Sequence, residues 1–557
     1  MTVARPWRPQ AALYERLRTS NKSEERWVKK AGMQRGGERE GTRRGSGKEA
    51  LGGPWRLRAA PGTGGEPHGI VPANRRGRGL PRPDITRGFV PHCGPGVPEV
   101  NTMVEVPIKM YMTNLLKQAR KALRPMAHLS GPAKDKGLTL LADLLVEKRE
   151  ELLAANQEDV LAAGKALEGE KDKDRVKAAV DRVRLTENDV TGLEQFLRQV
   201  VALPNPIGEL VDQREQPTGL QVGHMRAPLG MLGVLSELNP RHNVEILAQC
   251  FKSGNVTVFR GTPDWPHTWP LLSQWLKRAL EEVGAPTHAI TLVERPEKDA
   301  ALEVMRATRH QLDALIVRGG AGLRKTAIET SRLPILAHDG GICHGYIDEG
   351  ADLAMAQNLV VNSKIQDVHA ASSLDTILVH EGIARQFLPA LIRRLLDEFK
   401  VDVKGCVKTV AMIAPQPLAG YRNLVAVQEE DWSRQFNGPT LAVKMVGSLD
   451  EALDHIAQYG EGQTAFICTR TYHHALRFVR EVDASAVLVN ASSRLHAGDT
   501  FGMGGDVGLG HGRLLTRGPI GLEALTCLKY VAFGMGQLRH PHPVPVTYED
   551  AIMLKRY

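Results

Sequence analysis

Two glycine-bearing junctions in this chain carry residue types that could hold a phosphate group. The first reads Lys252-Ser253-Gly254-Asn255 and leads into an apolar run at 256–259 that ends in Arg260. Ligands of open parallel sheets gather at the carboxyl ends of the strands. A cation at that edge suits a ribose or its 2′-phosphate.

The second junction follows another apolar run, at 314–317, and reads Arg318-Gly319-Gly320-Ala321-Gly322. Glycines at the start of a helix let backbone amides approach a phosphate closely. Neither junction has the strict GxGxxG spacing. On the pattern alone, each also fits an ordinary turn between a strand and a helix.

Cysteine thiols are the other side chains of this chain that could take part in chemistry. The six cysteines include no CxxC pair, and they stand at Cys93, Cys250, Cys343, Cys406, Cys468 and Cys527. This spacing argues against a disulfide scaffold and a thiolate zinc site, and it suits a reducing cytosol. A cytoplasmic location is therefore expected.

Apolar runs and helical stretches alternate through the main body of the chain. Leucines at helical spacing predict one long amphipathic helix over 138–166. Helices are also expected at 244–252 and 269–283, and strands at 231–235, 256–259, 289–293, 314–317, 333–337, 376–379, 409–413, 441–446, 465–468 and 486–489. Strands that alternate with helices imply βαβ units, and hence parallel sheets in an α/β fold.

The basic charge of the chain is confined to its front segment. Residues 1–100 hold 20 Lys and Arg against 9 Asp and Glu, whereas the remaining residues hold 52 against 54. The front segment also holds 17 Gly and 11 Pro, so we expect 1–102 to be disordered. A basic arm, a transit peptide and non-functional sequence are the three interpretations, of which we favour the last. Nucleic-acid binding by the body is not expected, and no apolar run approaches the roughly 18 residues of a membrane span.

Long stretches of the body resemble gamma-glutamyl phosphate reductase, also called glutamate-5-semialdehyde dehydrogenase, of the aldehyde dehydrogenase superfamily. The resemblance extends from about residue 114 to residue 539. It rests on the segments 226–234, 252–255, 317–323, 341–344, 489–494 and 516–523.

The resemblance implies a Rossmann-type cofactor domain, an α/β catalytic domain and a β-hairpin that mediates oligomerisation. The implied reaction is the NADPH-dependent reduction of L-glutamate 5-phosphate to glutamate-5-semialdehyde and phosphate, in proline biosynthesis. A cysteine thiolate would attack the acyl phosphate, and hydride would then reduce the thioester. The implied partners are a second copy of the chain and glutamate 5-kinase. With NADP as the cofactor, the residues expected to bind it are Lys252, Gly254, Asn255, Arg260, Arg318, Gly319, Gly320 and Gly322.

The position of the family's nucleophile is occupied by alanine. The family segment reads close to N-A-K-T-Q-R-P-S-x-C-N, and here residues 362–372 align with it without a gap, so Ala371 takes the place of the cysteine. A methyl group has no lone pair and cannot form the thioester. A serine–histidine substitute built from His369, Ser372 and Ser373 is the weaker alternative.

Other departures accompany the missing thiol. The family's G-H-S-E-A is G-Q-T-A-F here, at 462–466, and its E-S-R-P-N-V is E-L-N-P-R-H, at 237–242. A histidine near the end of the chain is replaced by Leu515. Asn239 has two interpretations: an amide that stabilises an oxyanion, or a turn asparagine before Pro240.

We therefore predict a disordered extension at 1–102 and a dinucleotide-binding domain at 103–345, with the hairpin near 206–229. A catalytic domain at 346–480 follows, and residues 481–557 return to the cofactor domain. The chain is either a reductase of this type or a catalytically silent relative that acts as a binding or assembly partner.

Overall fold

The computed structural model describes residues 106–168, 172–413 and 422–537. The chain separates into two units, Met1–Glu99 and Val100–Tyr557, and every described residue belongs to the second. The extension predicted at 1–102 lies outside the described residues. No helix within the described residues is both long and apolar enough to cross a bilayer.

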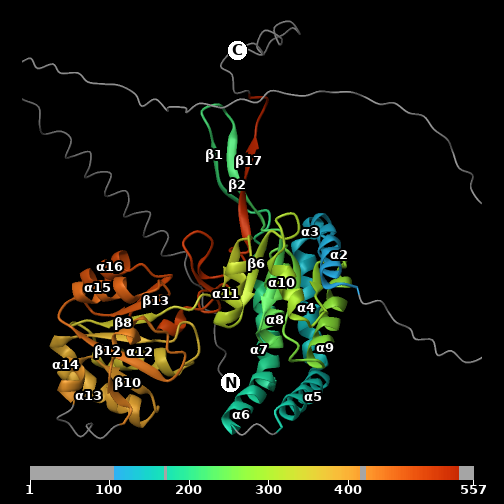
Figure 1. Cartoon of the computed structure of the whole chain (residues 1–557). Coiled ribbons are helices and arrows are strands. Elements are labelled where there is room, and N and C mark those ends of the chain that lie inside the picture. Colours follow the sequence, from blue (N-terminus) through green and yellow to red (C-terminus); the bar gives the residue numbers. More distant parts are fainter. Residues whose placement is uncertain (1–105, 169–171, 414–421, 538–557) are drawn as a thin grey trace, which may run out of the picture. The chain divides into compact units, whose positions relative to one another are not determined.

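A five-stranded parallel sheet forms the first half of the described fold (Figure 1). Its strand order is β5-β4-β3-β6-β7, with bounds β3 Met231–Ser236, β4 Val256–Arg260, β5 Ile290–Leu292, β6 Ala314–Arg318 and β7 Ile335–Ala337. The two central strands β3 and β6 are almost entirely buried, as continuous apolar runs in a parallel sheet require. All five strands confirm the expected positions.

Helices cover this sheet, and one expected helix is divided. The helices are α2 Ile108–Lys121, α3 Leu123–His128, α4 Gly131–Glu147, α5 Arg149–Ala166, α6 Lys173–Val183, α7 Glu187–Ala202, α8 Pro240–Lys252, α9 Thr268–Glu281, α10 Lys298–Met305 and α11 Ala321–Thr330. The single helix predicted over 138–166 is wrong, because Lys148 leaves helical geometry at φ −112° and ψ 28°. A change of helix direction at one residue leaves the leucine spacing on either side intact. The sequence pattern therefore does not indicate the break at Lys148.

A seven-stranded parallel sheet forms the second half, in the order β11-β10-β12-β9-β8-β13-β14. Its strands are β8 Cys343–Ile347, β9 Thr376–His380, β10 Asp402–Gly405, β11 Leu424–Ala426, β12 Thr440–Val446, β13 Thr464–Cys468 and β14 Ala486–Val489. Helical elements accompany it: α12 Leu353–Ile365, α13 Glu381–Asp397, α14 Val407–Ile413, η2 Glu429–Ser433, α15 Leu449–Tyr459, α16 Tyr472–Glu481 and η3 Ser493–Leu495.

The strand predicted at 409–413 is wrong, since these residues belong to the helix α14. A short apolar run does not distinguish a strand from a buried helical turn. In α14 the buried residues are Thr409 and Ile413, four residues apart, and therefore on one helical face.

The predicted domain limits stay a prediction, and the seven-stranded sheet extends across both of them. The limit predicted between 345 and 346 falls inside β8, which belongs to the seven-stranded sheet, and β14 extends that sheet beyond the limit predicted at 480. Hydrogen bonding between strands far apart in sequence determines which strands share a sheet, and local composition does not indicate it.

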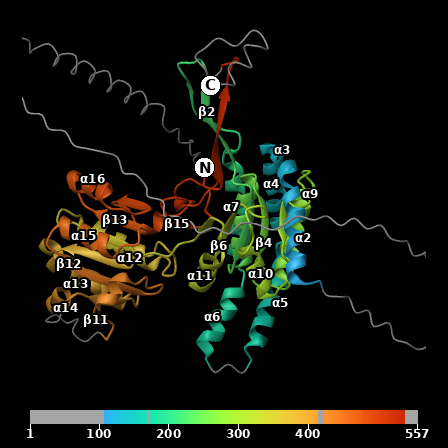
Figure 2. The same cartoon turned by 45° about the horizontal axis from the view of Figure 1, so that its top comes forward.

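Three strands pair as an antiparallel ladder that extends away from the five-stranded sheet (Figures 1 and 2). The predicted hairpin near 206–229 consists of β1 Leu210–Glu215 and β2 Gln221–Pro228, and β17 Thr526–Phe533 pairs with β2 along its whole length. A further two-stranded sheet joins β15 Leu509–His511 to β16 Arg517–Pro519.

The core beneath the five-stranded sheet has no room at Gly233, in the middle of β3. A Cβ there would lie 2.7 Å from Leu315 Cδ2 and 2.8 Å from Leu312 Cδ1. Gly233→Ala should therefore lower the free energy of unfolding by about 1–3 kcal/mol, as overpacked cores do. Gly322→Ala is the matched control, because nothing lies within 4 Å of its Cβ in α11 and alanine favours a helix. Urea denaturation measures both, and equal stability of the two variants would contradict the expectation.

Candidate functional site

A cavity of about 500 Å³ is lined by residues from the helices and strand ends of the five-stranded sheet, from the segment before β9 and from the segment that follows β14. The parts that contribute are α7, the first turns of α8, the ends of β6 and β7, the segment before β9, and residues 494–509. The carboxyl end of β6 thereby meets the residues that precede the amino end of β9. This is a common place for a ligand site in α/β proteins.

Ala371 lines this cavity, and no thiol of the described residues does. The cysteine nearest in the fold is Cys343, whose Sγ donates to the carbonyl oxygen of Ala371 at 3.2 Å. Cys343 is completely buried, and burial raises the pKa of its thiol far above the ordinary value. A buried neutral thiol is neither accessible nor nucleophilic. Cys343 is therefore not placed to act as a nucleophile in this cavity.

Two buried ionisable side chains, Lys364 at the end of α12 and Asp375 directly before β9, flank the residue-371 segment in the sequence. Asp375 accepts hydrogen bonds from the backbone N–H groups of Cys343 and Phe436, both at 3.1 Å, and burial raises its pKa to about 6. Lys364 is also fully buried, and its Nζ has no hydrogen-bond partner. Burial lowers the pKa of this ammonium group, while the charge of Asp375 acts in the opposite sense. Neither side chain lines the cavity.

The serine–histidine alternative finds no support in the contacts. His369 Nδ1–H donates to the carbonyl oxygen of Asn437 at 2.9 Å, and no hydrogen bond joins His369 to Ser372 or Ser373 among the described residues. Ser372 accepts a hydrogen bond from Arg494, and Ser373 donates to the Lys364 carbonyl at 3.5 Å. Both serines are buried.

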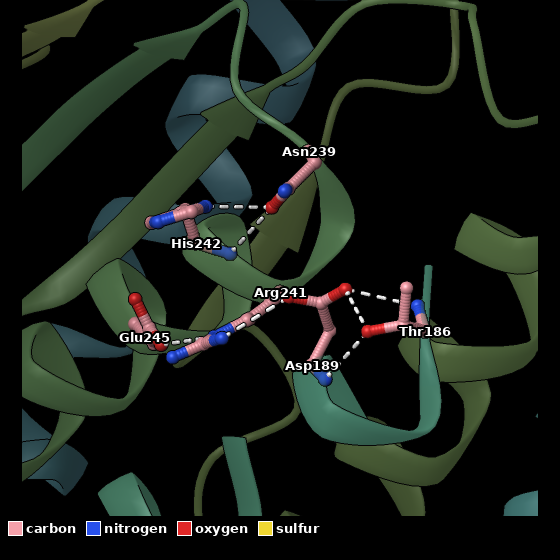
Figure 3. Close-up of polar contacts among 6 residues, drawn as sticks. All are labelled: Thr186, Asp189, Asn239, Arg241, His242 and Glu245. Carbon is pink, nitrogen blue, oxygen red and sulfur yellow. Dashed lines mark hydrogen bonds and ion pairs between the residues drawn. The ribbon is translucent and has the colours of Figure 1, made fainter. Parts of the chain in front are cut away.

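Three arginines line the cavity, and two of them are bound to other side chains. Arg241 pairs with Glu245 at 3.0 Å on its own helix and with Asp189 of α7 at 3.2 Å (Figure 3). Asp189 is itself held by Thr186, which begins α7 with a reciprocal cap. Arg494 donates to Gln366 Oε1 at 2.7 Å and to Ser372 Oγ.

Three histidines that line the cavity, His242, His338 and His496, are neutral at physiological pH. Burial and neighbouring arginines lower the pKa of His242 to about 4 and that of His338 to about 3, and burial alone lowers that of His496 to about 4. His338 Nδ1 accepts the backbone N–H of Leu509 at 3.0 Å, so its proton resides on Nε2.

Asn239 occupies the turn position and is not one of the residues that line the cavity. Its Oδ1 accepts the backbone N–H of His242 at 3.1 Å and lies 2.7 Å from His242 Nδ1 (Figure 3). This is an N-cap for α8, with Pro240 in the first turn. The geometry therefore favours the turn interpretation, and the oxyanion role is not supported.

Lys252, Gly254 and Asn255 do not lie where the nucleotide hypothesis requires. They precede β4, at the amino end of the strand. The fully buried Lys252 pairs with Asp135, and Asn255 bonds the backbone of Gly230 and Leu525 at 2.9 Å each. Gly254 has φ +78°, which favours glycine. These residues connect the sheet to the base of the ladder, so their assignment to a cofactor cleft is corrected.

The other candidates do lie at the carboxyl edge of the five-stranded sheet. Gly319, Gly320 and Gly322 begin α11 after β6, but the N–H of Gly320 already donates to the Glu237 carboxylate at 2.8 Å. At the end of β4, Arg260 donates to the Pro296 carbonyl at 2.7 Å.

Arg318, which ends β6, lines the Ala371 cavity. Its exact neighbours in sequence, Gly319 and Gly320, are exposed at the start of α11. Arg318 is thus the one candidate from the glycine-rich junctions that the fold brings to Ala371.

Sequence reasoning did not assign the polar residues that surround Ala371. These are Arg241, His242, Glu245, His338, Arg494, His496 and Asp506. Two of them, Arg241 and His242, stand in a segment that departs from the family pattern, and that clustering of departures is the signal that could have found them. The others come from turns and from the segment after β14, which no local pattern connects to α8.

The three neutral histidines predict how stability responds to acid. A histidine whose folded pKa is depressed contributes stability that is present above its unfolded value of 6.5 and is lost as pH falls towards its folded value. His338→Gln should therefore reduce the slope of unfolding free energy against pH, between about pH 6 and 4, by about one proton. Urea unfolding at successive pH values measures this slope. The exposed His310→Gln is the control, and an unchanged slope in His338→Gln would refute the expectation.

Comparison with known proteins agrees with this geometry. The model of the aldehyde dehydrogenase family matches residues 103–426. Gamma-glutamyl phosphate reductase of Thermodesulfovibrio yellowstonii is 38% identical over 432 residues, which cover 78% of this chain and 99% of that protein. The reductase of Clostridium novyi is 36% identical over 78% of this chain and 100% of its own length.

A solved structure gives the same result. The crystal structure of gamma-glutamyl phosphate reductase from Thermotoga maritima superposes with a TM-score of 0.71 at 32% identity, covering 77% of this chain and 100% of that one. With an expected nucleophile position inside the cavity and relatives matched over nearly their whole length, the chain belongs to the aldehyde dehydrogenase family and, within it, to the gamma-glutamyl phosphate reductases.

Proposed function

We propose that this chain is a member of the gamma-glutamyl phosphate reductases that binds a γ-glutamyl ligand in the Ala371 cavity but does not carry out the family's covalent reaction. The observation that supports this most directly is the methyl group at residue 371, in a cavity that no described thiol lines. The polar groups around it suit an anionic ligand. The chain would then act as a binding or assembly partner.

The chemical reason is the need for a good nucleophile that is also a good leaving group. In the family reaction, a thiolate displaces phosphate from the acyl phosphate, hydride reduces the resulting thioester, and the thiohemiacetal releases the aldehyde. Alanine supports none of these steps. Active reduction of L-glutamate 5-phosphate stays the second candidate, favoured by the 38% identity to a reductase, and it would have to proceed without a thioester.

NADP is the proposed nucleotide, and the glycine-rich start of α11 is its proposed site. When bound, a nicotinamide nucleotide supplies hydride. The open surroundings of Gly322, with nothing within 4 Å of its Cβ, fit a close approach by a phosphate. Glu237 opposes it, because its carboxylate accepts the Gly320 N–H that a pyrophosphate would take. The residues therefore fit the nucleotide only if Glu237 moves.

Oligomer formation and glutamate 5-kinase as a partner belong to the same proposal. The ladder of β1, β2 and β17 supports pairing between copies, because β17 leaves Tyr530 and Phe533 76% and 57% exposed. Glutamate 5-kinase would supply the acyl phosphate that the cavity receives. The cytoplasmic location stays a prediction.

Turnover by the purified full-length chain tests the missing-nucleophile proposal. The native chain should give no NADPH-dependent reduction of L-glutamate 5-phosphate, nor the reverse reaction with glutamate-5-semialdehyde, NADP and phosphate. Ala371→Cys should raise the rate at least about tenfold, because it restores the thiol in register. Ala370→Cys is the matched control, since Ala370 lines the same cavity one residue away. Native turnover that survives alkylation of all thiols would refute the proposal.

Fluorescence titration with NADPH and NADH tests the nucleotide site. Glu237→Gln should tighten binding of both nucleotides several-fold, because it removes a negative charge from the start of α11. Arg260→Gln should weaken NADPH more than NADH, since only NADPH carries the 2′-phosphate that a nearby guanidinium would bind. Equal effects of Arg260→Gln on both nucleotides would remove Arg260 from the site.

A further inference from the structure

Arg318 differs from the other arginines of the cavity because no side chain or backbone group neutralises it. Its Nε and Nη1 atoms are buried and have no hydrogen-bond partner. It forms no ion pair with any described residue, whereas Arg241 has two carboxylate partners. Buried N–H groups without acceptors carry a desolvation cost that a bound ligand would remove.

The surroundings of Arg318 leave space for its guanidinium on one side and supply a second donor. A Cβ at Gly508 would lie 3.0 Å from Arg318 Nη1 and 3.2 Å from His338 Cβ, so glycine is needed for this packing. His338 carries its proton on Nε2, because Nδ1 accepts the Leu509 N–H at 3.0 Å. Arg318 and His338 come from the ends of adjacent strands β6 and β7 and both line the cavity.

The nearby carboxylates do not neutralise this guanidinium by contact. Asp506 accepts the backbone N–H of Gly498 at 2.8 Å, and Glu245 is engaged with Arg241. Burial raises the pKa of both carboxyl groups.

The shape of the donor set distinguishes a phosphate from a carboxylate. A guanidinium engages two oxygens of one anion in a plane. The Nε2–H of His338 is a further donor in the same cavity, and a third acceptor oxygen on the ligand suits it. A tetrahedral phosphate has that oxygen, whereas a planar carboxylate does not.

We propose that Arg318, with His338 beside it and Gly508 making room, forms a phosphate-binding subsite of the Ala371 cavity, for inorganic phosphate or the phosphoryl group of an acyl phosphate. This inference rests on the proposed function, because the subsite would hold the phosphoryl group of the proposed γ-glutamyl ligand. It gives Arg318 a role in this cavity instead of the nucleotide cleft.

Isothermal titration of the full-length chain with inorganic phosphate tests this subsite, with acetate at matched ionic strength as the second probe. We expect saturable phosphate binding by the native chain and no saturable acetate binding. Arg318→Gln should weaken phosphate binding at least tenfold. Arg278→Gln is the control, because Arg278 is exposed on α9 and does not line the cavity, and the phosphate affinity of this variant should equal that of the native chain.

A second variant keeps the test decisive if Arg318→Gln does not fold. Gly508→Ala would place a methyl group against Nη1 and should weaken phosphate binding several-fold while circular dichroism remains native. Native-like phosphate affinity in both variants, absence of saturable binding by the native chain, or equal binding of acetate would each overturn the subsite. Thiol-independent turnover by the native chain would refute the proposed function and leave these binding results intact, so the two failures are distinguishable.

Discussion

A small set of hydrogen bonds around residue 371 determines what this cavity can do. Ser493 Oγ donates to the Ser372 carbonyl at 2.7 Å, Ser493 N–H donates to Ser363 Oγ at 3.1 Å, and Cys343 Sγ donates to the Ala371 carbonyl. They join the segment before β9 to α12, to β8 and to the segment after β14. Because all these groups are buried, breaking one bond leaves an unsatisfied polar atom. These bonds involve the backbone of residues 371 and 372, so they hold the residue-371 segment in place independently of the side chain at 371.

In the same cavity, charged and ionisable side chains surround Ala371. Arg241 and Arg494 are bound to neighbouring side chains, and the histidines are kept neutral by burial. Arg318 alone among these arginines retains unsatisfied buried N–H groups within the described residues. An alanine at the expected nucleophile position and an unpaired guanidinium in the same cavity are the two features on which the proposed anion binding rests. Binding and covalent chemistry depend on different residues here, so one can persist without the other.

Much of the fold could be predicted from local pattern, and the failures have physical causes. Buried strands such as β3 and β6 are continuous apolar runs, because both faces of a parallel sheet are covered. The run at 409–413 failed because a helical turn with residues 409 and 413 buried has the same composition. The assignment of Lys252 and Asn255 failed for another reason, since a lysine that pairs with Asp135 in the core looks the same in sequence as one that faces a ligand.

The sequence by itself determined the α/β class, the hairpin, the family and the alanine at the nucleophile's position, because each depends on contiguous residues. Only the tertiary structure decided which polar groups surround that alanine, since they come from α7, α8, β6, the end of β7 and the segment after β14. It also decided that Cys343 is buried behind the cavity and that Arg318 faces into it. Both outcomes depend on how two parallel sheets pack against one returning segment, and no pattern within a single segment encodes that packing.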